Sequence, residues 1–324
     1  MIPVNAENVP ALRAKVVELM GEMPARCPLR VETVEPAREQ DGLLWETIRY
    51  ESSPGEWVPA DVIRPADAHG PLPALVCCHG HGGNFEWGRD KNTGRSDVYR
   101  EESSGLTALE AAKAGFVVIV PDMLCFQDRR PPAELRAANP NYEGFAYELF
   151  EFWRAALNGS TLGARYAWDL HRAAEVLRSR EDVIEEKVGA FGISLGGQET
   201  LFLMLLDERI AAGVCCCGIG RWEAIFRDGV QHNKAAYLPG MLKHFDSEGV
   251  VAAIAPRPLL LLAGERDVMF PIDSVRQICR TAAKVYCDLG AEPAFTSYLF
   301  PGGHEWPKDM REYAFNDWLR DMLT

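Results

Sequence analysis

The sequence predicts an α/β protein in which a mostly parallel sheet carries helices on both faces. Short, wholly apolar runs typical of strands buried on both sides alternate with longer stretches of helical periodicity along most of the chain. Residues 44–50 and 57–64 instead alternate in polarity around the Pro54–Gly55 turn, which predicts an antiparallel hairpin at one edge of the sheet. The 324 residues are enough for one such domain with a large core.

The elements are expected in a regular order, beginning with a short amphipathic helix at 9–22 and a proline-containing connector. Strands are then predicted at 74–78, 116–120, 188–192, 211–217, 258–263 and 295–300, and helices near 104–114 and at 161–180, 195–206, 272–289 and 307–322. Gly115 and Gly290 lie where the C-caps of two of these helices are expected. We therefore divide the chain into an N-terminal helix and connector (1–41) and a single domain (42–324).

Two stretches do not fit this alternation and are predicted to be insertions above the sheet. Residues 123–160 are rich in proline and aromatic side chains, and residues 219–256 include Trp222 and His232. Both stretches follow predicted strands, so they could form a lid and a substrate pocket. The alternative is that their aromatic side chains pack on one another as the core of a small subdomain.

A serine lies between a predicted strand and a predicted helix. Residues 192–196 read Gly-Ile-Ser-Leu-Gly, which matches the G-x-S-x-G pattern. The small residues on either side let the backbone turn sharply, so that the hydroxyl projects from the edge of the sheet. The first turn of the following helix directs backbone N–H groups toward negative charge that develops there. Ser194 is therefore the candidate nucleophile.

An acid and a histidine follow this serine, each at the end of a predicted strand. Asp267 ends the turn Gly-Glu-Arg-Asp after the strand at 258–263, and His304 ends a glycine-rich loop after the strand at 295–300. The order Ser, Asp, His is the one expected for a catalytic triad on a parallel sheet. The carboxyl ends of parallel strands meet at one edge, so the three side chains are expected to converge. Their alternative roles are a turn serine, a helix-capping aspartate and a surface histidine.

A glycine-rich loop follows the strand at 74–78, about 110 residues before the serine. Residues 79–83 read His-Gly-His-Gly-Gly, and their glycines let backbone N–H groups approach a substrate oxygen. We assign the two oxyanion donors to the amides of His81 and Leu195, a pair that typically contributes several kcal/mol of transition-state stabilisation. Metal binding by His79 and His81 is the alternative, although no third ligand lies at metal-site spacing.

These motifs resemble those of the α/β-hydrolase superfamily, and within it the branch of dienelactone hydrolases and acetyl xylan esterases. The resemblance covers roughly residues 42–324. Dienelactone hydrolases use a cysteine nucleophile where this chain has Ser194, and the acetyl xylan and cephalosporin deacetylases usually carry glutamine where this chain has Leu195. The resemblance implies an α/β-hydrolase fold and small acyl substrates, acetyl above all, on a sugar-like or other bulky alcohol.

We expect a serine carboxylic-ester hydrolase that works through an acyl-enzyme intermediate. In this mechanism His304 takes the proton of Ser194 and Asp267 orients the imidazole, so neither a metal nor another cofactor is needed. Three alternatives remain: a peptidase, a hydrolase of carbon–carbon bonds in diketone-like substrates, and a ligand receptor with little turnover. Prolyl-oligopeptidase-like enzymes usually carry a propeller, for which the roughly 70 residues before the core strands are too few.

The charge of the chain bears on its partners. A formal net charge of −13 argues against nucleic acid and anionic membrane surfaces, which leaves a small-molecule ester as the expected partner. A homo-oligomer is compatible with the sequence. The first residues lack the basic region and apolar core of a signal peptide, and no apolar run is long enough to cross a bilayer.

Nine cysteines are present, an odd number that does not fit a disulfide framework. Five of them lie in the apolar runs at 77–78 and 215–217, where a buried thiol behaves as a small hydrophobic group. Reduced thiols are typical of the cytoplasm, which is the expected location.

Five further residues near the proposed site each have two possible roles or a supporting one. Further pocket candidates follow the glycine-rich loop, with surface solvation as the alternative: Trp87, Arg89, Asp90 and Lys91. Asp122 ends the strand at 116–120 and is expected to brace loops rather than to take part in chemistry.

Overall fold

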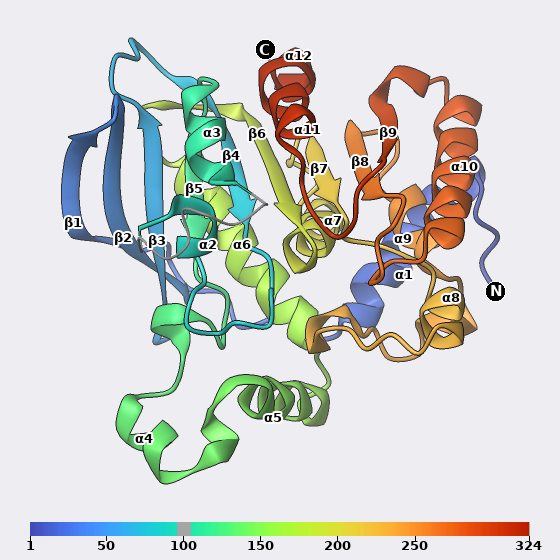
Figure 1. Ribbon diagram of the computed structural model, residues 1–324, viewed down its shortest axis with the longest axis horizontal. Coiled ribbons are helices and arrows are strands. Elements are labelled where there is room, and N and C mark those ends of the chain that lie inside the picture. Colours follow the sequence, from blue (N-terminus) through green and yellow to red (C-terminus); the bar gives the residue numbers. More distant parts are fainter. Residues whose placement is uncertain (96–104, 324) are drawn as a thin grey trace.

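The computed structural model describes residues 1–95 and 105–323, which contain a nine-stranded sheet of order β1-β2-β3-β5-β4-β6-β7-β8-β9 (Figure 1). The first three strands pair antiparallel, and β3 is antiparallel to β5. All later pairs are parallel. The strands are β1 (Val31–Gln40), β2 (Leu43–Ser53), β3 (Glu56–Pro65), β4 (Leu72–Cys78), β5 (Val117–Pro121), β6 (Val183–Ile193), β7 (Gly213–Cys216), β8 (Leu259–Gly264) and β9 (Phe295–Phe300). The predicted α/β fold with an antiparallel N-terminal hairpin is confirmed.

Helices cover both faces of the sheet. The main ones are α1 (Val9–Met20), α3 (Thr107–Lys113), α6 (Leu162–Arg178), α7 (Leu195–Leu206), α9 (Ser247–Ala252), α10 (Ile272–Asp288), α11 (Lys308–Glu312), the π-helical turn η8 (Tyr313–Trp318) and α12 (Leu319–Leu323). Short segments are η1 (Ala6–Asn8), α2 (Asp90–Thr93) and η7 (Glu292–Ala294). The helix predicted near 104–114 begins at Thr107 in the structure, and residue 104 lies outside the described residues.

Two apolar cores fill the spaces between the sheet and its helices. Side chains of α1, α6, α7, α9 and α10 belong to one core, and side chains of α3, η8 and α12 belong to the other. Consecutive residues of the central strand β4 divide between them, because Val76 and Cys78 face the first core whereas Leu75 and Cys77 face the second. This alternation is what a sheet covered on both sides requires.

One part of the N-terminal prediction is wrong. Residues 31–40 were expected to belong to a connector, but they form the edge strand β1, which pairs with β2 from Val31 opposite Tyr50 to Gln40 opposite Leu43. Every residue of β1 is exposed, so neither face of the strand needs apolar side chains. The sequence therefore lacks the alternation of apolar and polar residues from which a strand is predicted. Backbone hydrogen bonds to β2 hold β1 in the sheet.

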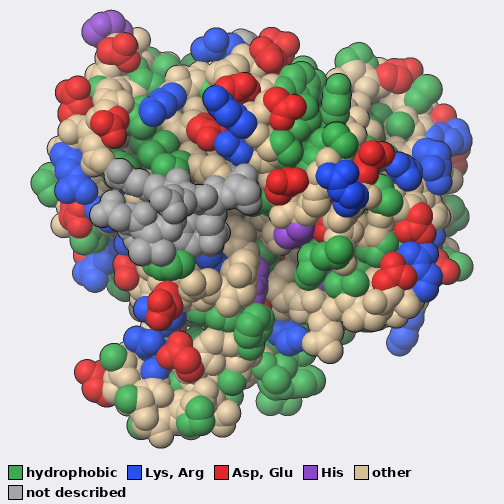
Figure 2. Space-filling model, viewed as in Figure 1, with side chains coloured by type: hydrophobic (Ala, Val, Ile, Leu, Met, Phe, Trp, Pro, Cys, Tyr) green, Lys and Arg blue, Asp and Glu red, His purple; other side chains and the backbone are tan. Residues whose placement is uncertain are grey.

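The two irregular stretches are insertions that follow β5 and β7. The first contains η3 (Gln127–Arg129), α4 (Ala133–Ala138), η4 (Pro140–Tyr142) and α5 (Gly144–Leu157). The second contains α8 (Trp222–Arg227), η5 (Lys234–Ala236), η6 (Met241–Lys243) and α9. Helices α4 and α5 project from the main body, and hydrophobic side chains appear on the surface of this projection (Figures 1 and 2).

The cysteines are free thiols. Cys27 is half-buried and Cys287 is exposed, while the other seven are buried. Among the described residues, the helices are either too short or too polar to cross a membrane.

Candidate active site

Ser194 lies in a strained turn between β6 and α7. Its backbone has φ +60° and ψ −121°, in the left-handed half of conformational space that residues other than glycine rarely adopt. A Cβ atom on Gly196 would lie 1.9 Å from the carbonyl oxygen of Cys78, so only glycine allows α7 to start this close to β4. The N–H of Ser194 donates to the carbonyl of Cys216 (2.9 Å), which ties the turn to the end of β7.

Asp267 and His304 form a hydrogen-bonded pair. Nδ1 of His304 lies 2.8 Å from Oδ2 of Asp267, and the other carboxylate oxygen accepts the N–H groups of Met269 (2.7 Å) and Phe270 (3.3 Å). Burial by itself raises the pKa of Asp267, but the hydrogen bond and charge of His304 outweigh burial and leave that pKa below its usual value. The carboxylate is therefore ionised, and each of its two oxygens has a hydrogen-bond partner. The bond to His304 fixes the orientation of the imidazole.

The close packing of two loops explains how this pair forms. A Cβ atom on Gly264 would lie 2.0 Å from the carbonyl oxygen of Gly303, so the turn that carries Asp267 and the loop that carries His304 can approach this closely only because residue 264 is a glycine. The side chain of His304 keeps 27% of its surface exposed, whereas that of Asp267 is buried. No hydrogen bond joins Ser194 Oγ to His304 in this conformation of the described residues. Such bonds often tighten only when substrate binds.

Glu265, the other acid in the same turn, does not take part in this pair. Its exposed carboxylate lies 2.7 Å from Nη2 of Arg276 at the surface.

The glycine-rich loop at 79–83 lies beside the serine turn. A Cβ atom on Gly80 would be 3.3 Å from the carbonyl oxygen of Ile193, which places the loop against the end of β6. In the described part of the chain, no hydrogen bond uses the N–H of His81 or of Leu195. Leu195 is the first residue of α7, where the N–H groups have no partner within the helix. Both amides are thus available to a ligand.

The ring nitrogens of the two loop histidines are already engaged. Nε2 of His79 accepts the N–H of Met123 (3.0 Å), so its Nδ1–H donates to the carbonyl of Gly80 (3.1 Å). Nδ1 of His81 accepts the N–H of Gly83 (3.0 Å), so its Nε2–H donates to the buried carboxylate of Glu148 on α5 (3.2 Å). These contacts use the lone pairs that a metal ion would need, which argues against the metal alternative for His79 and His81.

One cysteine lies closer to the Asp267–His304 pair than the sequence indicated. Cys217, Asp267 and His304 each offer a potential metal-ligand atom within 4.8 Å of the others. However, Asp267 and His304 bond to each other, and the Cys217 thiol donates to the carbonyl of Glu305 (3.5 Å). Cys217 was expected to be a strand core residue. Cys217 directly follows β7, and the ends of the neighbouring strands carry Asp267 and His304, so its place in the sequence could have predicted this proximity.

The charged residues after the glycine-rich loop are buried rather than solvated. The guanidinium of Arg89 pairs with the carboxylates of Asp122, Asp61 and Asp128. Burial raises the pKa of Asp122 to about 7, although the charge of Arg89 opposes this shift. Asp122 also accepts the N–H of Arg89 (2.8 Å), so it braces the loops as predicted. Asp90 bonds to Gln127 (2.9 Å), which makes it part of the same support.

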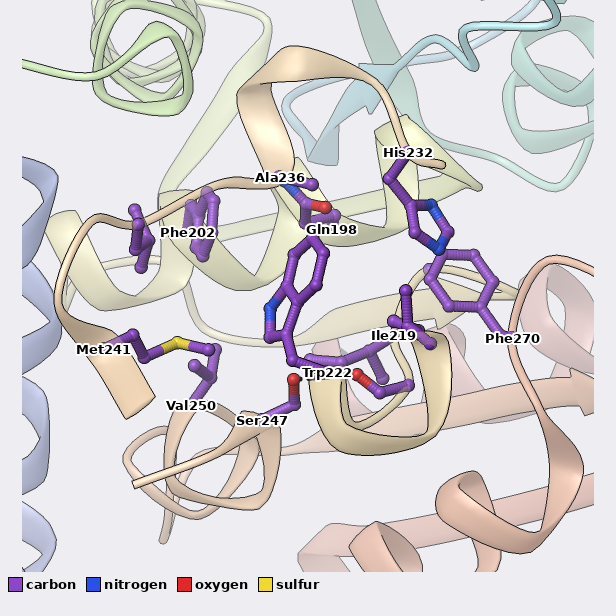
Figure 3. A pocket seen from close by; sticks show the side chains of 14 residues that line it. Gln198, Phe202, Ile219, Trp222, His232, Ala236, Met241, Ser247, Val250 and Phe270 are labelled. Carbon is purple, nitrogen blue, oxygen red and sulfur yellow. Dashed lines mark hydrogen bonds between the residues drawn. The ribbon is translucent and has the colours of Figure 1, made fainter. Parts of the chain in front are cut away.

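A small pocket lies between α7 and the second insertion (Figure 3). Gln198, one helical turn after Ser194, contributes to its wall, and Trp222 and His232 line it from the insertion. The ring of Phe270 lies between the pocket and His304, because its centroid is 4.6 Å from that of His232 and 5.9 Å from that of His304.

The lining of this pocket carries no charge. None of its residues is acidic or a lysine or arginine, and burial lowers the pKa of His232 to about 4, so that this ring is neutral near pH 7. The first insertion reaches the other side of the site, where the ring of Phe145 stacks on that of His81 at 5.5 Å and stays 59% exposed. Both insertions therefore contribute walls around the strand ends. Figure 2 shows histidine side chains at the surface in a hollow in the middle of this face.

Comparison with known proteins places the chain among hydrolases. The dienelactone hydrolase family matches residues 99–292, and the chain belongs to this family. YtaP of Bacillus subtilis (strain 168), which is named as a hydrolase without a substrate, is 28% identical over 294 residues, or 90% of this chain and 92% of YtaP.

Solved structures share the fold. A glucuronoyl esterase from Solibacter usitatus has a TM-score of 0.67 and 17% identity, over 96% of this chain and 92% of its own. Acetyl xylan esterase 1 from Thermoanaerobacterium sp. JW/SL YS485 has a TM-score of 0.63 and 17% identity, over 99% and 95% of the two chains. The fold, the family and the resemblance inferred from the sequence agree, and the protein is an enzyme of the hydrolase class.

Proposed function

We propose that this enzyme is a serine carboxylic-ester hydrolase in which Ser194, Asp267 and His304 form the catalytic triad. The observation that carries the proposal is the Asp267–His304 hydrogen bond of 2.8 Å at the strand edge that also bears the strained turn of Ser194. Among the described residues, two backbone N–H groups beside this turn make no hydrogen bond: that of Leu195 at the start of α7, and that of His81 on the loop whose Gly80 packs against the end of β6.

The proposed mechanism follows from these positions. Nε2 of His304 takes the hydroxyl proton as Ser194 Oγ attacks the ester carbonyl, and the amides of His81 and Leu195 donate to the resulting oxyanion. Collapse of this intermediate breaks the bond to the alcohol oxygen, which takes the proton from His304, and leaves the acyl group on Ser194. A water molecule then repeats the sequence, releases the acid and restores the serine.

We propose that the pocket next to α7 binds the acyl group of the ester, and that it prefers an acyl group that is small and uncharged. An apolar wall with a neutral histidine favours such a group by burying its surface, whereas a charged group would lose its hydration without gaining a partner. The names of the acetyl xylan esterases that share the fold are consistent with an acetyl group. The nine free thiols support a reducing location, and we propose that the enzyme acts in the cytoplasm.

We expect aryl esters to be hydrolysed with a preference for short acyl chains. In a series of aryl esters from acetate to octanoate, kcat/KM should fall once the acyl group is too long for the pocket. Each 1.4 kcal/mol of transition-state binding that is lost lowers kcat/KM about tenfold. Amides and diketones measured in the same panel are expected to turn over far more slowly. Faster cleavage of either class than of any ester would contradict the ester-hydrolase proposal.

Chelators and thiol reagents are expected to leave the activity intact. The side chains of Cys217, Asp267 and His304 are engaged with protein partners, and a buried thiol is protected from alkylation. Ester turnover is measured after dialysis against EDTA and, separately, after treatment of the native protein with iodoacetamide. Complete loss with EDTA that a single divalent ion reverses would contradict the metal-free mechanism and return His79 and His81 to the candidates for metal ligands.

A further inference from the structure

A buried lysine contacts two backbone carbonyl groups of the glycine-rich loop at 79–83. Lys91, on the short helix α2, is 8% exposed, and its Nζ lies 3.0 Å from the carbonyl oxygen of Gly80 and 2.6 Å from that of His81. The ammonium group also lies over the ring of Phe126, 4.4 Å from the ring centroid. Since an amphipathic lysine side chain usually keeps its charge in water, this burial indicates a specific role.

The carbonyl of Gly80 accepts a second hydrogen bond. It comes from Nδ1–H of His79 (3.1 Å), whose tautomer is set because its Nε2 accepts the N–H of Met123. Burial, assisted by the positive charge of Lys91, lowers the pKa of His79 well below its usual value, so the ring stays neutral and keeps this arrangement. Two donors therefore occupy both lone pairs of one carbonyl oxygen.

This carbonyl belongs to the same peptide unit as the N–H of His81. Because a trans peptide unit is planar, its C=O and N–H point in opposite directions, and a donor that fixes the C=O also fixes the N–H. A positive charge at the oxygen end further polarises the unit, which strengthens the N–H as a donor to negative charge at the other end. The two effects act on the amide that the proposed mechanism uses to stabilise the oxyanion.

We propose that Lys91 is a positioning residue that orients and polarises the Gly80–His81 peptide toward the oxyanion of the transition state. The inference rests on the proposed ester-hydrolase function. In this role Lys91 acts on the reaction through the backbone of the loop, where its ammonium group lies 3.0 Å from the carbonyl oxygen of Gly80. Its contribution should consequently appear in the chemical step and not in the binding of the ground-state substrate.

The test replaces Lys91 with methionine, which keeps the length and apolar character of the side chain but removes the charge and the donors. Loss of a whole oxyanion donor typically costs 10²–10³ in kcat, so a misoriented donor is expected to lower kcat by about 10- to 100-fold with KM nearly unchanged. The affinity of an aryl boronic acid, which forms a tetrahedral adduct on a catalytic serine, should fall by the same factor as kcat/KM. An ether analogue of the substrate, which has no carbonyl, should bind Lys91→Met and the wild type equally.

Two further variants accompany this measurement. Lys113→Met removes the same charge from the exposed end of α3, and it should leave kcat, KM and both affinities unchanged. Lys91→Gln keeps one donor for a carbonyl without the charge, and it is expected to lose less activity than Lys91→Met. If Lys91→Met yields little folded protein, Lys91→Gln decides the question by the same comparison of boronic acid and ether.

The outcomes separate this inference from the proposed function. A kcat within twofold of wild type for both Lys91 variants would overturn the inference alone, as would an equal loss of affinity for the boronic acid and the ether. No ester turnover by the wild type, or boronic acid binding that does not depend on Ser194, would overturn the proposed function and the role of Lys91 with it.

Discussion

Replacing Ser194 with alanine is expected to abolish ester turnover while the protein stays folded. Loss of a triad nucleophile typically removes about six orders of magnitude in kcat, because no other group can form the acyl-enzyme. The fold should tolerate the change, since Ser194 contributes its backbone N–H, rather than its hydroxyl, to the contact with Cys216. Initial rates with an aryl acetate measure the loss, and thermal unfolding measures the fold.

Covalent labelling provides a second measurement of the same serine. A fluorophosphonate probe should modify the wild type on Ser194, as determined by mass spectrometry of the digested protein, and should not modify Ser194→Ala. Ser179→Ala, which removes a hydroxyl at the end of α6, serves as the control and should be labelled like the wild type. Labelling of a different serine, or an active Ser194→Ala variant, would place the nucleophile elsewhere.

Replacing Asp267 with asparagine is expected to lower kcat/KM by up to about 10⁴-fold. The carboxylate accepts the Nδ1–H of His304 at 2.8 Å, which leaves Nε2 free to act as the base. An asparagine amide of the same shape can donate to Nδ1, and this favours the tautomer with its proton on Nε2, which cannot accept the proton of Ser194. Rates over a series of ester concentrations provide kcat/KM for the variant.

Glu265→Gln is the matched control for Asp267→Asn, because both variants change one carboxylate of the same turn to an amide. Glu265 is exposed and pairs with Arg276 at the surface, where an ion pair contributes little stability. Its loss should therefore change kcat/KM only slightly. A severe defect in Glu265→Gln together with a mild one in Asp267→Asn would show that the acid of the triad had been assigned to the wrong residue.

Much of the candidate site could be predicted because its residues occupy positions with strong local constraints. The turn around Ser194 requires small neighbours, and the proposed nucleophile and acid each follow a buried apolar run, whereas the proposed base follows the edge strand β9, which is buried only at its last residue. Once the strands are parallel, their carboxyl ends converge without further information. The edge strand β1 escaped prediction because its side chains are all exposed and its stability comes from backbone pairing with β2.

The sequence by itself predicted the α/β fold, the order of the strands after β1 and the residues proposed as nucleophile, acid and base, because these depend on local periodicity and on glycines beside single residues. Only the tertiary structure decided that Lys91 lies beneath the loop at 79–83, that Cys217 lies beside Asp267, and that the second insertion lines the pocket. These relations join residues on different loops, whose mutual positions depend on how the insertions pack over the sheet. Local sequence patterns cannot predict that packing, because the same polar side chain can be solvated or buried depending on which segment folds over it.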